Sequence, residues 1–300
     1  MAYRSPNSAL RLVTHSFLIF CLLSVASCMQ KSSDASTQAT LFDRDNLVAW
    51  CIVAYDDLQR EPAERMEMLH DLGVSQYAYD WREKHLDSFA DEIQAARQAG
   101  VDITAVWIWI DQRSSSEQLS KDNQSILNTM KEQDLRSHIW VGFSDNFFDE
   151  MDDRTSYQTA EGVIARLAEE AGEQATKIGL YNHGGWLGEP DHQTNLIKSM
   201  QNPKLGIVYN FHHAHHQIDQ LPQLLDKMNP YLLTVNLNGM NAEGPKILPI
   251  GQGEEEAQMI RQLQNSGYRG PIGILGHVED EDVKQVLKRN LEGLYQIVSE

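Results

Sequence analysis

The chain has 300 residues, with 43 acidic side chains against 25 basic ones, and its formal net charge is −18 at pH 7. Proteins that grip nucleic-acid backbones normally present a basic face, so this charge balance argues against a nucleic acid as partner. Two of the three cysteines, Cys21 and Cys28, lie in the first 28 residues, which leaves Cys51 alone in the rest of the chain and excludes an intrachain disulfide or a paired-cysteine metal site there.

The N-terminal segment has the layout of a secretory signal. Arg4 and Arg11 come before the apolar run FLIFCLLSVA (17–26), which is too short to span a bilayer as a stable helix. The run ends in VASC (25–28), which resembles a bacterial lipobox, whose cysteine is lipidated and becomes the new N-terminus. An ordinary signal peptide cleaved nearby, or an uncleaved short anchor, is the alternative.

We therefore expect three parts: a lipoprotein-type signal peptide over 1–28 with Cys28 as the lipidation site, a flexible tether over 29–44, and one folded domain over 45–300. Met29 rather than aspartate follows the cysteine, so the signal that retains bacterial lipoproteins at the inner membrane is absent. The expected location is the bacterial cell envelope, at the outer membrane or the periplasmic face, and the lipid anchor is the only expected contact with the membrane.

Short apolar runs rich in β-branched and aromatic residues recur along the domain at intervals of roughly 25–35 residues, the spacing of strand–helix units. The expected strands are 47–53, 75–80, 102–110, 138–143, 177–183, 205–211, 232–239 and 270–277. Helical patterns lie between them, among them 62–73, 86–100, 163–172, 217–228 and 282–298. Eight strands alternating with helices predict an α/β fold, the closed (β/α)8 TIM barrel. An open doubly wound sheet is the alternative, which the lack of a Gly-x-Gly-x-x-Gly turn after the first strand disfavours.

Active sites of such barrels lie at the C-terminal ends of the strands, so the residues that end each expected strand are candidates for a site. These residues are unusually polar and aromatic: Asp80, Trp81, Arg82, Trp109, Asp145, Tyr181, Asn182, His183, Trp186, Asn210, Asn236 and Asn238. Amides and imidazoles hydrogen-bond to sugar hydroxyls and an indole face packs on C–H groups, so the set predicts binding of a small carbohydrate. Tryptophans that only fill the core, and a structural ion pair of Asp80 with Arg82, are the alternatives. The long loops 144–157 and 240–252 are expected to form a rim.

Several strand ends resemble the motifs of one family. LYNHGG (180–185) is similar to the Leu-Glu-Asn-His-Gly-Gly segment of the sugar phosphate isomerase/epimerase family, the xylose isomerase-like TIM barrels that also include type 2 AP endonucleases. VYNFHHAH (208–215), TVNLNG (234–239) and GPIGILGH (270–277) are similar to its later strands. The resemblance implies a barrel that isomerises or epimerises sugars and binds one divalent metal. In the family, Glu, Asp, His and Glu hold the metal, and the two glutamates also act as acid and base. An AP endonuclease would need several metals and a basic DNA-binding face.

This chain departs from the family at the metal ligands. The matching positions hold Tyr181, Asn210, Asn236 and Leu275, and of the typical motif only His213 and the pair Asn182-His183 remain. Side chains alternate along a strand, so a residue two positions further on points the same way, about 6–7 Å nearer the mouth. We therefore expect His183, His212 and His277 to form a shifted site for one zinc or manganese ion, or else to hydrogen-bond to sugar hydroxyls as neutral groups.

The expected activity is an isomerisation or epimerisation of a small carbohydrate, for example a keto-sugar, by proton transfer beside a carbonyl group, or else a lyase reaction that begins with the same proton abstraction. Asp80, Glu189 and Asp145 are the candidate carboxylate bases, and His183 and His213 are the alternatives. The strand ends offer little positive charge besides Arg82, so a phosphorylated sugar is not expected. The alternative is a non-catalytic barrel that binds a carbohydrate or a partner protein.

Overall fold

The computed structural model describes residues 41–299. The predicted signal peptide, the lipidation site Cys28 and most of the predicted tether fall outside these residues and stay predictions. The last residues assigned to the tether belong to the domain instead, because Leu41 and Phe42 are buried in its core. Within the described part of the chain, no helix combines the length and the apolar character needed to cross a membrane.

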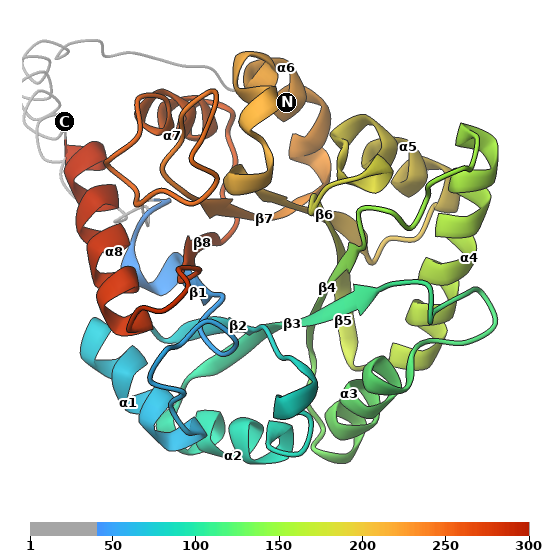
Figure 1. Ribbon diagram of the computed structural model, residues 1–300, viewed down its shortest axis with the longest axis horizontal. Helices are drawn as coiled ribbons and strands as arrows, with labels where there is room; N and C mark the ends of the chain where they lie inside the picture. Colours follow the sequence, from blue (N-terminus) through green and yellow to red (C-terminus); the bar gives the residue numbers. More distant parts are fainter. Residues whose placement is uncertain (1–40, 300) are drawn as a thin grey trace, which may run out of the picture. The chain divides into compact units, whose positions relative to one another are not determined.

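Eight parallel strands in this part of the chain close into a barrel in sequence order, and β8 pairs with β1 (Figure 1). They are β1 (Leu47–Trp50), β2 (Gln76–Tyr79), β3 (Asp102–Ile110), β4 (Ser137–Phe143), β5 (Ala175–Tyr181), β6 (Leu205–Asn210), β7 (Leu232–Leu237) and β8 (Ile272–Leu275). The predicted (β/α)8 TIM barrel is confirmed. Several strands end two or three residues before their predicted ends, because the chain leaves the sheet there to form the loops of the rim.

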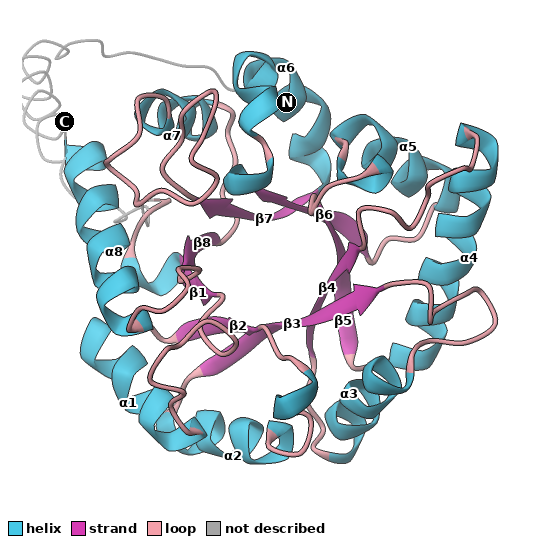
Figure 2. Ribbon diagram, viewed as in Figure 1, coloured by secondary structure: helices cyan, strands magenta, loops and turns pink. Residues whose placement is uncertain are grey.

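An α-helix follows each strand, and together the helices surround the barrel (Figure 2). They are α1 (Pro62–Leu72), α2 (Phe89–Ala99), α3 (Lys121–Glu132), α4 (Asp153–Ala171), α5 (Pro190–Met200), α6 (Leu221–Met228), α7 (Glu256–Asn265) and α8 (Val283–Ser299). Short 3-10 helices in the connections include Glu83–His85, Phe211–His213 and His215–Gln220. Gly73 and Gly100, with φ of 65° and 67°, end α1 and α2 in the left-handed conformation that glycine adopts without steric cost.

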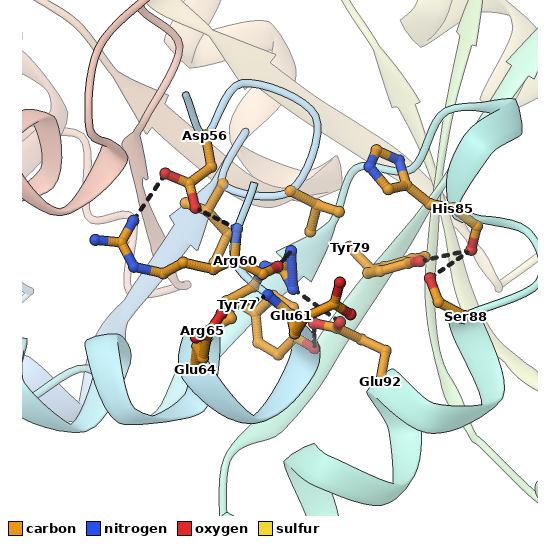
Figure 3. A network of polar contacts seen from close by, with 12 residues as sticks. Asp56, Arg60, Glu61, Glu64, Arg65, Tyr77, Tyr79, His85, Ser88 and Glu92 are labelled. Atoms are coloured by element: carbon orange, nitrogen blue, oxygen red, sulfur yellow. Dashed lines mark hydrogen bonds and ion pairs between the residues drawn. The ribbon is translucent and has the colours of Figure 1, made fainter. Parts of the chain in front are cut away.

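A buried ion pair joins α1 to α2 beside the loops that follow β1 and β2 (Figure 3). Nη1 of Arg65 donates to Oε2 of Glu92 at 2.9 Å, and the hydroxyl of Tyr77 on β2 donates to Oε1 of Glu92 at 2.8 Å. The side chains of Arg65 and Glu92 are only 4% and 2% exposed. A buried charge that loses its partner is costly, so these three groups hold β2, α1 and α2 together as one unit.

Candidate functional site

A cavity of about 400 Å³ opens at the C-terminal ends of the strands, where a barrel of this kind carries its site. Of the residues predicted from the sequence, Asp80, Trp81, Arg82, Trp109, Tyr181, His183, His212, His213 and His277 line it. The remaining lining residues are Trp50, Cys51, Tyr55, Glu83, Trp107, Arg113, Asp122, Asn123 and Lys246. A larger hollow of about 630 Å³ lies at the opposite end of the barrel, around the strand starts Gln76, Asp102 and Ser137, where barrel enzymes do not carry their active sites.

Aromatic side chains from β1, β3 and β5 pack together on one side of the cavity. The ring centroid of Trp107 lies 5.6 Å from that of Trp50, 5.8 Å from that of Trp109 and 4.9 Å from that of Tyr181. Trp109 is partly exposed, whereas the other three are buried. A partly exposed indole beside hydrogen-bonding groups offers the surface on which the C–H face of a sugar ring packs, so Trp109 stands where its predicted role requires it.

Four imidazoles line the same cavity: His183 after β5, His212 and His213 after β6, and His277 after β8. Ring centroids are 4.5 Å apart for His183 and His213, 3.7 Å for His212 and His213, and 6.0 Å for His212 and His277. Burial lowers the pKa of all four, and the positive charge of Lys246 adds to the effect. Neutral imidazoles both donate and accept hydrogen bonds, which suits contacts with sugar hydroxyls and proton transfer.

His183 is paired with Asp145, which follows β4. Its Nδ1 lies 3.3 Å from Oδ1 of Asp145. Two glycines make room for Asp145: a Cβ on Gly184 would lie 2.7 Å from its carboxylate Oδ1, and a Cβ on Gly185 would lie 2.5 Å from its backbone carbonyl oxygen. The carboxylate favours the tautomer with the hydrogen on Nδ1, which leaves a lone pair on Nε2, the arrangement of an oriented general base.

The carboxylate of Asp80 lies at the cavity but is engaged with the loop after β1. It accepts the backbone N–H groups of Ile52 and Val53 at 2.9 Å and that of Ala54 at 3.2 Å. Burial raises the pKa of this carboxyl to about 6, and these hydrogen bonds act in the opposite direction. The geometry makes Asp80 a positioning residue for the loop that carries Tyr55, in place of the free base expected from the sequence.

Arg82, Arg113 and Lys246 line the cavity, so the expectation that little positive charge besides Arg82 lies at the mouth is wrong. Arg113 is paired with two neighbouring aspartates at 2.9 and 2.7 Å. Arg82 donates only to uncharged oxygens, among them the Tyr55 hydroxyl at 2.9 Å. The amino group of Lys246 has no hydrogen-bond or ion-pair partner within residues 41–299. The sequence pointed to the loop 240–252 as a rim, but not to its lysine.

Trp186 and Glu189, predicted as site residues, lie outside the cavity. Gly184 and Gly185, both with positive φ, separate Trp186 from the end of β5, and the Trp186 ring stacks on His192 with ring centroids 4.2 Å apart. A carboxylate oxygen of Glu189 accepts from Nε2 of Gln217 at 3.1 Å, at the start of α5. Neither residue therefore lines the cavity, in contrast to its predicted place, because both follow the turn at Gly184 and Gly185.

The predicted amides also do not line the cavity. Asn182 joins β5 to β6, because its side chain donates to the carbonyl of Asn210 at 3.1 Å and accepts from the backbone N–H of Asn210 at 2.7 Å. Asn210 and Asn236 are themselves fully buried. Nδ2 of Asn238 donates to the carbonyl of Lys246 at 3.0 Å and so holds the β7–α7 loop. Asn182, Asn210 and Asn238 thus bind other parts of the protein, whereas the buried amide of Asn236 has no hydrogen-bond partner within residues 41–299. None of the four lines the cavity, which corrects their assignment as substrate-binding groups.

The residues at the family's metal-ligand positions do not fit a divalent metal. The hydroxyl of Tyr181 accepts from Nε1 of Trp50 at 2.9 Å and from Nδ2 of Asn210, so the phenol and the amide are bound to each other. Leu275, which is buried, offers only hydrocarbon. A phenol, neutral amides and an alkyl group are poor ligands for a hard cation, so no catalytic step is assigned to a metal at these positions.

The shifted histidine site expected for zinc or manganese is not formed by the side chains as they lie. Within residues 41–299, no three His, Cys, Asp or Glu side chains are grouped in a way that could hold a metal ion. His277 packs on Tyr55 with ring centroids 3.6 Å apart, and His183 is turned toward Asp145. His183 and His277, two of the three expected metal ligands, are therefore in contact with other side chains. The third expected ligand is His212.

Residues 77–297 match the family model described as a xylose isomerase-like TIM barrel. No curated protein sequence matches the chain. Similar solved structures include 3-keto-D-glucoside 4-epimerase YcjR from E. coli, with a TM-score of 0.62 and 14% identity over 85% of this chain and 100% of that one. D-psicose 3-epimerase from Clostridium cellulolyticum H10, solved with D-tagatose, has a TM-score of 0.62 and 10% identity over 85% and 98% of the two chains. The IOLI protein with a bound zinc atom has a TM-score of 0.66 and 10% identity over 85% and 98%. The chain belongs to the xylose isomerase-like TIM barrel family.

Proposed function

We propose that the protein binds a small carbohydrate in the cavity at the C-terminal ends of its strands and isomerises or epimerises it by moving a proton beside a carbonyl group. The observation that carries the proposal is the His183–Asp145 pair next to Trp109, whose ring centroid lies 4.7 Å from that of His183. It joins an oriented base to a surface on which a sugar ring packs. Two sugar epimerases of the same fold support the proposal.

The proton transfer uses neutral imidazoles. Nε2 of His183 takes the proton from the carbon beside the carbonyl, which leaves an enediolate on the sugar and an imidazolium that Asp145 stabilises. The imidazolium of His183 can return this proton to the neighbouring carbon, which isomerises the sugar. Epimerisation instead requires a second acid that protonates the same carbon from the opposite face. His213, with its ring 4.5 Å from that of His183, is a second imidazole within reach of the same substrate.

A second candidate function is carbohydrate binding without chemistry. It is favoured by the side chains that stand in place of the family's metal ligands, because Tyr181 and Asn210 are bound to each other and offer neither a base nor a Lewis acid. The aromatic wall and the imidazoles would serve a binder as well as an enzyme.

Deuterium exchange separates the two candidates. The purified protein is incubated in D₂O with a panel of aldoses and ketoses, and NMR follows loss of the signal from the C–H beside the carbonyl. The proposal expects exchange by the wild type and none by His183→Ala, with sugar binding kept. The control is His70→Ala, which removes an exposed imidazole on α1. Binding without exchange by the wild type would establish the binder, and a panel without any binding sugar would reject both.

Metal content belongs to the same experiment. Zinc and manganese in the purified protein are measured by mass spectrometry, together with His277→Ala. Near-stoichiometric metal that the variant loses would mean that the imidazoles rearrange around an ion, and the three-histidine site would replace the metal-free scheme. A metal content that is the same in His277→Ala as in the wild type leaves the metal-free scheme in place.

We also propose that the protein is exported and held at the bacterial cell envelope by a lipid on Cys28. The support is the sequence of the segment 1–28, with its basic start, its apolar run and its lipobox-like end. Cells given labelled palmitate should label the wild type and not Cys28→Ser. Equal labelling of the two would reject the anchor.

A further inference from the structure

We infer that Tyr55 is the second acid of the proposed reaction: its hydroxyl gives a proton to the substrate carbon from the side opposite His183, so that the protein epimerises its sugar. The inference rests on the proposed function, because it needs the enediolate that His183 forms. It adds a residue that lies neither at a predicted strand end nor at a metal-ligand position of the family, since Tyr55 belongs to the loop between β1 and α1.

Tyr55 and His183 reach the cavity from opposite strands of the barrel. β1 and β5 face each other across the closed ring of eight strands (Figure 1). The last residues of these two strands meet in the interior, where Nε1 of Trp50 lies 2.9 Å from the hydroxyl oxygen of Tyr181. Tyr55 and His183 follow them along the chain, and both line the cavity. A sugar in the cavity therefore lies between the Tyr55 hydroxyl and the His183 imidazole.

The loop that carries Tyr55 is held in place by the protein. Cys51, the first residue after β1, has a φ of 59°, in the left-handed region that residues other than glycine rarely adopt. The Asp80 carboxylate accepts the N–H groups of the next three residues, 52–54. The Tyr55 ring then packs on His277, with ring centroids 3.6 Å apart. These contacts fix the ring on the side of the cavity formed by β1, β2 and β8.

The Tyr55 hydroxyl is arranged to donate a proton. Nη2 of Arg82 donates to its oxygen at 2.9 Å, and the guanidinium lies 5.2 Å from the ring centroid. No acceptor within residues 41–299 takes the hydroxyl hydrogen, so this hydrogen is available to a bound ligand. Burial raises the pKa of Tyr55 to about 12, so the hydroxyl carries its proton at neutral pH. The charge of Arg82, which keeps its own protons, stabilises the tyrosinate that is left after the donation.

Other titratable groups of the cavity are less suited to this step. His213 stands beside His183, with ring centroids 4.5 Å apart, and so lies on the same side of a bound sugar. Both carboxylate oxygens of Asp80 accept backbone N–H groups. Burial lowers the pKa of His277 to about 4, and the neutral imidazole that results is a weaker acid than a phenol. The Tyr55 hydroxyl is thus the best placed acid opposite His183.

Two protons move in one turnover. Nε2 of His183 takes the hydrogen from the carbon beside the carbonyl group, and the electron pair of that C–H bond forms the enediolate. The same carbon then takes the hydrogen of the Tyr55 hydroxyl on its opposite face, while the carbonyl group re-forms. The configuration at this carbon is inverted. One proton passes from the imidazolium to the tyrosinate through water, which restores both groups.

Tyr55→Phe tests the inference, because it removes the hydroxyl and keeps the ring that packs on His277. The protein is incubated in D₂O with the exchange panel, among it D-fructose, D-tagatose and D-glucose. NMR follows both the loss of the C–H signal beside the carbonyl group and the appearance of the epimer. We expect the variant to form the epimer at least about 100-fold more slowly, while C–H exchange stays within about threefold of the wild type. The control Tyr231→Phe removes a hydroxyl before β7, at the opposite end of the barrel, and should keep both rates.

The outcomes separate this inference from the proposed function. If Tyr55→Phe forms the epimer at the rate of the wild type, another group such as the Cys51 thiol supplies the proton, and the inference is overturned while the proposed function stands. Equal loss of exchange and of epimer formation would also overturn it, because the hydroxyl would then serve substrate binding or the first proton transfer. So would a wild type that exchanges the C–H and forms only the isomer. If the wild type exchanges no sugar of the panel, the proposed function fails and the inference fails with it.

Discussion

Replacement of Glu92 by glutamine tests whether the buried ion pair holds the first two strand–helix units together. Glu92 accepts from Arg65 and from Tyr77, and glutamine offers one oxygen to these two donors. Arg65, with a side chain only 4% exposed, would keep its charge without a counterion. Loss of one partner from a buried pair costs about 3–5 kcal/mol, and a folded domain is stable by about 5–15 kcal/mol in total. We therefore expect Glu92→Gln to lower the free energy of unfolding by about 3–5 kcal/mol.

Urea unfolding, followed by tryptophan fluorescence and far-UV circular dichroism, measures this change. The double variant Arg65→Met, Glu92→Leu removes both charges. Its loss of free energy of unfolding should be clearly smaller than the sum of the losses in the single variants Arg65→Met and Glu92→Leu. Arg166, which pairs with Glu170 on the surface of α4, is the control: Arg166→Met should change stability much less than Glu92→Gln does. If the double variant costs as much as the two single variants together, the two charges are not coupled and the reasoning is refuted.

Three further predictions concern the cavity. Trp109→Ala should weaken carbohydrate binding by about three- to tenfold, and calorimetry that finds unchanged affinity would remove the indole from the binding surface. Burial lowers the pKa of His277 from 6.5 to about 4, so its neutral form stabilises the fold above about pH 6.5 and this contribution is lost as the pH falls toward 4. The free energy of unfolding lost in this way is at most about 3 kcal/mol. Urea unfolding midpoints at about pH 7 and about pH 4.5 should therefore differ less in His277→Gln than in the wild type. Equal differences in the two proteins would contradict the lowered pKa of His277. Asp80→Ala should speed hydrogen exchange at residues 52–54, whose N–H groups lose their acceptor, and unchanged protection there would show that Asp80 does not hold the loop.

The barrel could be predicted because its strands are apolar on both faces and its helices are apolar on one. β3 has the predicted bounds, 102–110, since the run DITAVWIWI is too β-branched and aromatic for a surface helix. α4 was predicted to begin at 163 and begins at Asp153, where the Asp152 side chain accepts from the backbone N–H of Thr155. The first turns of α4 bury only Ser156 and Ala160, so the apolar periodicity that signals a helix is weak there.

The site could be predicted only as far as the strands run. The alternation of side chains placed His183, His212 and His277 at the cavity, and all three line it. It failed for Asn238, because β7 ends at Leu237 and the chain has already left the sheet. Lys246 could not be found in this way. Its place depends on contacts between loops that are distant in sequence, and no periodicity records them.

Tyr181 keeps its proton across the physiological pH range, because burial raises the pKa of its hydroxyl well above the usual value. Its partners, the indole of Trp50 and the amide of Asn210, do not titrate there either. A centre built from carboxylates and a metal ion would instead lose its ion as its ligands protonate or as a chelator competes. The innermost layer of this cavity therefore carries no charge from mildly acidic to alkaline solution. Among the groups discussed, those of the cavity that change charge in mildly acidic solution are therefore the imidazoles and Asp80.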